Sequence, residues 1–128
     1  MDWLKKEGVP VLLASLWIGV SEFLRNEIFF KTYWTNHYLS LGLKFPSDPI
    51  NGAIWGVWSV FLAILIYVLT SRFSLFQAWL IAWFGGFVLM WIVIGNMGVL
   101  PSGILYFAIP WSLLEVLGGA LIIRKLAK

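Results

Sequence analysis

Three ionisable side chains and one amide lie within six positions of an otherwise apolar segment: Glu22, Arg25, Asn26 and Glu27. An ionisable side chain inside a membrane costs about 2.5–3.5 kcal/mol on insertion scales, so such groups face a polar partner or cavity. At helical spacing, Glu22 and Asn26 share one face and Arg25 flanks it. We therefore take these three as candidates for a ligand- or proton-binding site, while Glu27 should lie off this face, near the outer surface.

A second carboxylate, Glu115, lies in the last apolar segment. From the helical rise, Glu22 is about 18 Å and Glu115 about 14 Å from the expected cytoplasmic ends of their helices. Both would then lie near mid-membrane, where Glu22, Arg25 and Glu115 could form a carboxylate–guanidinium–carboxylate group. Secondary candidates are Asn51, Asn96 and Tyr106, which with His37 would line an outward-opening cavity, and Trp111 and Ser112, which share a helix face with Glu115.

The same residues also fit a purely structural interpretation. Glu22 and Arg25 could form an intrahelical pair that offsets its own burial, and Glu115 could make one buried structural hydrogen bond. A stripe of small residues in the second apolar segment, Gly52, Gly56, Ser59 and Ala63, is typical of close helix packing in membranes. The sequence leaves open whether the polar residues form a site or only hold the helices together.

Several chemistries are disfavoured by composition. The chain has no Cys and a single His, so we expect no thiolate nucleophile, no metal site and no cofactor. The sequence has no Ser/His/Asp set placed for acyl transfer and no phosphate-binding loop, and we assign no catalytic residues. Glu22 and Glu115 as an acid/base pair remain the one enzymatic alternative. The net charge of +3 comes mainly from lysines near the chain ends, so we expect no nucleic-acid partner.

Composition predicts a membrane protein. The chain is 61% hydrophobic and 12% charged, about half the charged fraction of a soluble domain. Four segments are apolar and long enough to span a bilayer, at about 10–30, 49–70, 75–96 and 101–123. The expected fold is an all-α, four-transmembrane-helix bundle forming one domain over 1–128. Lys5 and Lys6 before the first segment imitate a signal peptide, but no cleavage site follows, so we expect a retained helix.

Local signals refine these helices. Residues 31–41 contain neither Gly nor Pro, which predicts that the first helix continues to about 41 and projects beyond the membrane. Asp48 should cap the second helix with Pro49 in its first turn, and Ser74 should begin the third with a capping box. Pro110 should kink the fourth helix.

Basic residues predict the orientation. One side of the membrane would carry six of them and the other side only two, Lys31 and Lys44. The six are Lys5, Lys6, Arg72, Arg124, Lys125 and Lys128. Since Lys and Arg concentrate in cytoplasmic loops, both termini should lie in the cytoplasm.

Some features resemble a known family. Four short helices, the isolated Glu22 in the first of them and the stretch Pro-Ser-Gly-Ile-Leu-Tyr at 101–106 are similar to the small multidrug resistance transporters. The chain departs from that family in the Arg-Asn-Glu run after the glutamate, in a longer first loop and in placing the Pro-Ser-Gly stretch in the fourth helix. No functional residue is carried over from the resemblance.

Three functions are compatible with these observations. The chain could be a small transporter or small-molecule-binding protein, exchanging a proton on Glu22 against its substrate and working as a homodimer. It could be an accessory or assembly subunit whose polar cluster is structural and whose partner is another membrane protein or a second copy. It could also bind lipid or a hydrophobic ligand without transporting it. Membrane lipids are expected partners in each case.

Overall fold

The computed structural model describes residues 2–127, and within them the chain is helical throughout with short connections. The elements in chain order are η1 (Leu4–Gly8), α1 (Val9–Phe23), η2 (Leu24–Phe29), α2 (Lys31–Ser40), α3 (Pro49–Arg72), α4 (Leu75–Trp83), η3 (Phe84–Val88), α5 (Leu89–Asn96) and α6 (Leu105–Leu126), where η denotes a π-helical turn. Four continuous helical stretches of the described chain are long and apolar enough to span a membrane: Leu4–Phe29, Pro49–Arg72, Leu75–Asn96 and Leu105–Leu126. The predicted all-α protein with four candidate membrane spans is confirmed.

The two predicted helix starts are confirmed. The Asp48 backbone N–H donates to Asn51 Oδ1 at 3.0 Å, and Pro49 occupies the first turn of α3. At the start of α4, the Gln77 backbone N–H donates to Ser74 Oγ at 3.2 Å. These contacts satisfy backbone donors that a helix start otherwise leaves unpaired.

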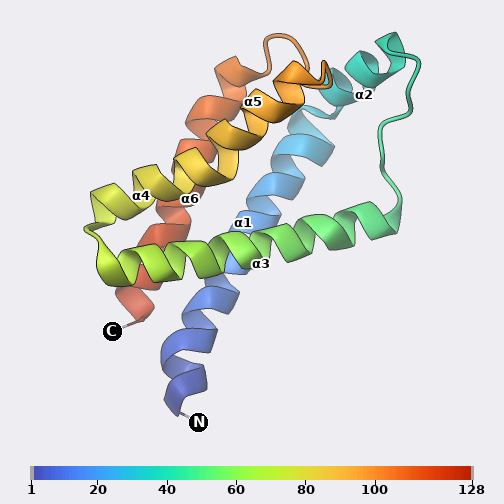
Figure 1. Cartoon of the computed structure of the whole chain (residues 1–128). Helices are drawn as coiled ribbons and strands as arrows, with labels where there is room; N and C mark the ends of the chain where they lie inside the picture. Colours follow the sequence, from blue (N-terminus) through green and yellow to red (C-terminus); the bar gives the residue numbers. More distant parts are fainter. Residues whose placement is uncertain (1, 128) are drawn as a thin grey trace.

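The first long helix differs from the prediction of one continuous helix to about 41. It ends at η2, where the Phe30 N–H bonds the Arg25 carbonyl five residues back at 2.8 Å. Phe30 then leaves helical geometry at φ −121°, ψ 17°, and α2 runs in a new direction (Figure 1). Gly42, at φ +75°, follows α2 in a left-handed conformation that favours glycine.

The last span begins later than predicted. Pro101 to Ile104 form a turn, with Gly103 at φ +82°, so α6 starts at Leu105. Pro110 lies inside α6, which continues to Leu126 without interruption. Because proline has no N–H, it cannot bond the carbonyl four residues earlier, and α6 tolerates this local loss.

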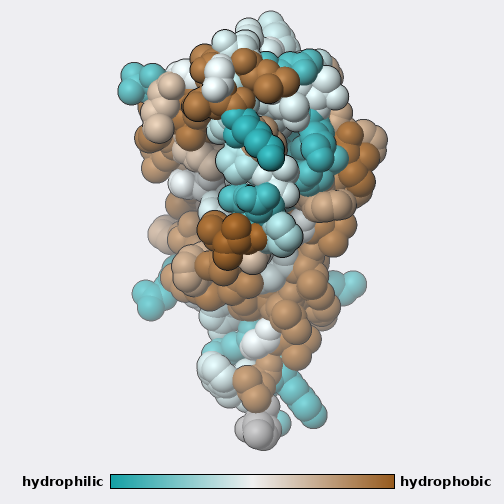
Figure 2. All heavy atoms as spheres, turned by 90° about the vertical axis from the view of Figure 1, so that its right-hand side faces the viewer, coloured by the Kyte–Doolittle hydropathy of each residue, from teal (hydrophilic) through white to brown (hydrophobic). Residues whose placement is uncertain are grey.

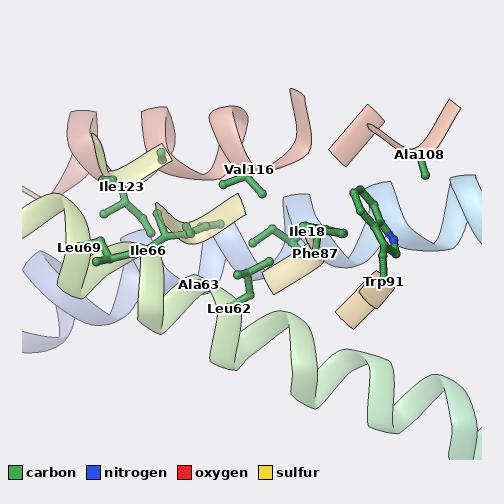
Figure 3. Close-up of a cluster of buried hydrophobic side chains, with 14 residues drawn as sticks. Ile18, Leu62, Ala63, Ile66, Leu69, Phe87, Trp91, Ala108, Val116 and Ile123 are labelled. Carbon is green, nitrogen blue, oxygen red and sulfur yellow. The ribbon is translucent and has the colours of Figure 1, made fainter. Parts of the chain in front are cut away.

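The packed core is built from small side chains. α1 lies against both α3 and α6, and α4 lies against the same two helices. The buried residues include Ala14, Ala63, Ala78, Ala82 and Ala120, with Ile18, Ile66, Phe87 and Val116 filling the space between them (Figure 3). Small residues let helix backbones approach closely, which favours helix association where lipid provides no hydrophobic drive.

The stripe of small residues on α3 divides into two parts. Ser59 and Ala63 are buried against α1 and the core, as the packing interpretation predicts. Gly52 and Gly56 have no neighbouring atom within 4 Å of a built Cβ in the described chain. They line an open space because α3 crosses α1 obliquely and its N-terminal half diverges from the bundle (Figure 1). Within one chain, therefore, no helix of the described residues packs closely against these two glycines.

Candidate functional site

Glu22, Arg25 and Asn26 form one hydrogen-bonded cluster. Arg25 Nη2 donates to Glu22 Oε2 at 2.5 Å, and Asn26 Nδ2 donates to the same oxygen at 2.9 Å. Glu22 and Arg25 are both almost fully buried. Trp34 of α2 extends the cluster, since its Nε1 donates to Asn26 Oδ1 at 3.1 Å. The structure thus brings together the three residues singled out in the first span.

The π turn η2 places these residues. Arg25, Asn26 and Glu27 all lie within it, and π turns occur often at functional sites. The widened turn also brings Glu27 to the cavity described below, although α-helical spacing predicted that it would lie off this face. Glu27 is half-buried, with its carboxylate 3.4 Å from Lys31 Nζ. Glu27 takes no part in the hydrogen bonds of the Glu22 cluster, in keeping with its expected position off that face, although it borders the cavity.

Phe87 covers the Arg25 side chain from a second π turn. The guanidinium carbon lies 5.5 Å from the centre of the buried Phe87 ring, a distance at which a cation is attracted to the ring face. η3 reaches this position because Gly86 lies against Leu62, where a built Cβ would be only 3.0 Å from the Leu62 side chain. The Gly85-Gly86 pair was the available sequence signal for this close approach.

Glu115 reaches the cluster from α6. Its side chain is 1% exposed, and its carboxyl lies beside the Glu22 carboxyl and the Ser21 hydroxyl, with the Arg25 charge nearby. Among the described residues, four buried side-chain atoms have no hydrogen-bond partner: Glu22 Oε1, Arg25 Nη1 and both oxygens of Glu115. All four belong to this cluster, so its hydrogen bonding is incomplete.

A cavity of about 610 Å³ opens beside Glu22. Its polar lining comes from Glu22, Arg25, Asn26, Glu27, Asp48 and Asn51, and its aromatic lining from Trp34, Tyr38, Phe45, Trp55 and Trp91. The walls belong to the end of α1, η2, α2, the α2–α3 connection, the N-terminal half of α3, α5, the α5–α6 connection and the first turn of α6. Figure 2 shows hydrophilic side chains gathered in the upper part of the face that carries the α2–α3 connection, above a mostly apolar lower part.

A smaller cavity of about 300 Å³ lies between α1 and α6. Its lining is Trp17, Val20, Ser21, Leu24, Trp111, Leu114 and Glu115. Two indole N–H groups stabilise this interface: Trp17 donates to the Glu115 backbone carbonyl at 2.8 Å and Trp111 to Ser21 Oγ at 2.9 Å. Glu22 borders the large cavity and Glu115 the small one, so the carboxyl pair lies between them.

The secondary candidate residues occupy different positions in the structure. Asn51 borders the large cavity and Trp111 the small one. Ser112 is buried but fully engaged, accepting from Trp83 Nε1 at 2.9 Å and donating to the Ile109 carbonyl at 3.0 Å. His37 Nε2 lies 2.7 Å from the Gly98 carbonyl and connects α2 to the turn after α5.

Asn96 and Tyr106 do not line either cavity. Asn96 is exposed at the end of α5, and Tyr106 is 85% exposed on α6. The inner face of α6 is formed by Ala108 and Ser112. Tyr106 precedes Ala108 by two positions, which places it on the opposite side of a helix. The prediction that these two residues line the cavity is wrong.

The arrangement brings together chemical groups of the kind that small-molecule binding sites use. It combines a buried acid–base pair, an amide and a second carboxyl with aromatic walls suited to an apolar group. The unpaired atoms of the cluster leave polar groups that a ligand or a proton could satisfy. Comparison with protein-family models, with curated proteins and with solved structures finds no match for the chain.

Proposed function

We propose that this multi-pass membrane protein binds a small molecule in the large cavity, with Glu22, Arg25 and Asn26 at its polar base. The observation that carries the proposal is the buried, incompletely hydrogen-bonded Glu22–Arg25 pair beside a cavity of about 610 Å³. Small-molecule sites are commonly cavities of about 300–1,000 Å³ with mostly apolar walls and few convergent polar groups. A buried ionisable pair inside a membrane span is itself typical of a functional position.

The lining supports a small amphiphilic ligand. Trp55 and Trp91 offer flat apolar surfaces, while Asn26 and Asn51 offer both donors and acceptors. A ligand with one hydrogen-bonding head and an apolar or aromatic body would match both surfaces at once. A highly charged ligand would match only the small polar part.

The proposal extends to transport. With the two termini in the cytoplasm, as the Lys and Arg distribution favours, the large cavity opens toward the outer side and α2 lies at the outer interface. Pro110 weakens the hydrogen bonding of α6 near Glu115, which would give that helix a kink or hinge for opening the α1–α6 interface. A single four-span chain encloses little volume, so the transporting unit would be a homodimer.

A ligand screen on purified protein in lipid nanodiscs tests the binding proposal. The panel contains neutral, anionic and cationic amphiphiles of similar size, and the readout is the ligand-induced rise in melting temperature. We expect at least one member to stabilise the wild type, and Asn26→Leu to abolish that rise. Asn96→Leu, an exposed position outside the cavity, is the matched control and should respond like the wild type. If the ligand raised the melting temperatures of the two variants equally, Asn26 would not be part of the binding site.

A flux assay tests the transport extension. Proteoliposomes containing the wild type should move a ligand found in the screen, and Glu22→Gln should move it more slowly while Asn96→Leu keeps the wild-type rate. Binding without flux in the wild type would restrict the protein to ligand or lipid binding.

The exposed glycines of α3 favour one alternative. Gly52 and Gly56 present an open helix surface, and a helix from a second copy could fill the wedge beside them. In that case the chain would be an assembly or homo-oligomeric subunit and its polar cluster would be structural. Native mass spectrometry distinguishes the two. A stable dimer that Gly52→Leu dissociates would favour the alternative, whereas a dimer insensitive to this change would leave the cavity free for a ligand.

A further inference from the structure

We propose that Glu22 and Glu115 together bind one proton, held as a hydrogen bond from a neutral Glu115 to an ionised Glu22. The inference concerns the carboxyl pair itself and does not depend on whether the large cavity binds a ligand. It assigns the proton to a defined position between the two cavities.

Charge balance is the first argument. The buried cluster contains two carboxyl groups, Glu22 and Glu115, and one guanidinium, Arg25. With both carboxyl groups ionised, the cluster would carry one uncompensated negative charge out of contact with water, and buried uncompensated charges are strongly unfavourable. One bound proton makes the cluster electrically neutral.

Among the described residues, no other charged side chain forms an ion pair with the cluster. In the sequence, residues 73–114 contain no Asp, Glu, Lys, Arg or His, so α4, η3, α5 and the first half of α6 contribute none. The only charged residue of α3 is Arg72, at the opposite end of that helix. Arg124 is also at that end, bonded to the Thr70 carbonyl at 3.3 Å, and Glu27 has its own partner in Lys31.

Hydrogen-bond balance is the second argument. Ionised carboxylates only accept, so two of them side by side cannot pair. Glu22 Oε1 and both Glu115 oxygens are buried acceptors without a donor in the part of the chain that the structure describes. A proton on Glu115 turns one of these oxygens into a donor aimed at Glu22, which satisfies an orphan atom on each side.

The same contacts decide which carboxyl carries the proton. Glu22 Oε2 accepts from Arg25 Nη2 and from Asn26 Nδ2, and donors of this kind stabilise an ionised carboxylate. Within residues 2–127, Glu115 has no donor at bonding geometry. The proton therefore belongs on Glu115, and the negative charge on Glu22 beside the guanidinium.

Infrared spectroscopy of the protein in lipid at neutral pH tests this assignment, because a protonated carboxylic acid absorbs apart from carboxylates. The chain has six carboxyl side chains, and Asp2, Glu7, Glu27 and Asp48 are at least partly exposed. We expect an acid carbonyl band in the wild type that shifts in D₂O. Glu27→Gln should keep the band and serves as the matched control.

Substitution of each of the two buried glutamates makes the test specific for a shared proton. Glu115→Gln should lose the band, since Glu22 alone is balanced by Arg25. Glu22→Gln should lose it as well, because Glu115 would then become the only partner of the guanidinium. A band that survives Glu22→Gln, or a wild type without the band, would overturn the proposal. The wild-type spectrum alone decides it if either variant fails to fold.

Discussion

The indole of Trp17 fills the space beside Gly118, where a Cβ would lie 2.5 Å from the ring. In the same position, Trp17 Nε1 donates to the Glu115 backbone carbonyl at 2.8 Å. One aromatic side chain thus fixes α1 against α6 at the level of the carboxyl pair. Since the backbone of α6 is held there, the Glu115 side chain is held beside Glu22 rather than free to turn away.

This contact predicts that Gly118→Ala destabilises the protein. The added methyl group must displace the ring, and overpacking of this kind typically costs about 1–3 kcal/mol. Thermal unfolding in detergent measures the loss. Gly85→Ala is the control, because nothing lies within 4 Å of a Cβ at Gly85 in the described residues. If Gly85→Ala lost as much stability as Gly118→Ala, the role given to the Trp17 contact would be contradicted.

The chain of bonds from Trp34 through Asn26 to Glu22 predicts energetic coupling between α2 and the cluster. Asn26→Ala leaves the Trp34 N–H and one Glu22 contact unsatisfied, and we expect a loss of about 1–3 kcal/mol. A double-mutant cycle with Trp34→Phe should show a coupling energy of about 0.5–1.5 kcal/mol. Asn36→Ala, exposed on the same helix, should be nearly neutral. If the effects of Asn26→Ala and Trp34→Phe on stability were additive, the hydrogen bond between these side chains would contribute little.

The bound proton predicts how stability depends on pH. In the unfolded chain both glutamates are in water and ionised at neutral pH, so the folded protein holds one proton more. Raising the pH then favours the unfolded state, by about 1.4 kcal/mol per pH unit while that proton is held. Melting temperatures between pH 6 and 8 should fall for the wild type and change less for Glu115→Gln. If the melting temperatures of the wild type and Glu115→Gln changed equally with pH, the result would argue against a proton bound by the carboxyl pair.

The open cavity predicts that a bulky residue at Gly56 blocks ligand binding without unfolding the protein. Gly56 lines the cavity with free space beside it, so Gly56→Leu should fit. We expect loss of at least tenfold in affinity for a ligand found in the screen, with the melting temperature of the empty protein nearly unchanged. Gly85→Leu, on the apolar surface, should bind normally. Unchanged affinity of Gly56→Leu would place the ligand elsewhere.

Sequence patterns predicted the parts of this protein that local chemistry determines. The lengths of the apolar runs predicted the four spans, and the N-cap at Asp48 and the capping box at Ser74 formed as expected. The spacing of Glu22, Arg25 and Asn26 sufficed to predict their cluster because all three lie within one helical turn. The partnership with Glu115 was also expected from the depth of each residue.

Other features depended on tertiary packing and could not be predicted. The π turns η2 and η3 have no recognised sequence signature, and the chain changes direction at Phe30, directly after η2. The open wedge beside Gly52 results from the crossing of α3 over α1, which no pattern within one helix encodes. Tyr106 is a different case, because helical spacing alone places it opposite the buried Ala108 and its outward position could have been predicted.

Thiol labelling most directly tests the central claim, that a water-accessible cavity lies beside the buried cluster. The chain contains no Cys, so single-cysteine variants report one position each. We compare Gly56→Cys in the cavity with Gly85→Cys on the apolar surface, using a charged, water-soluble thiol reagent on membrane fragments open to both sides. Thiols react as thiolates, which form in water and not in hydrocarbon. The account predicts rapid labelling at Gly56 and none at Gly85; equal protection of both positions would contradict it.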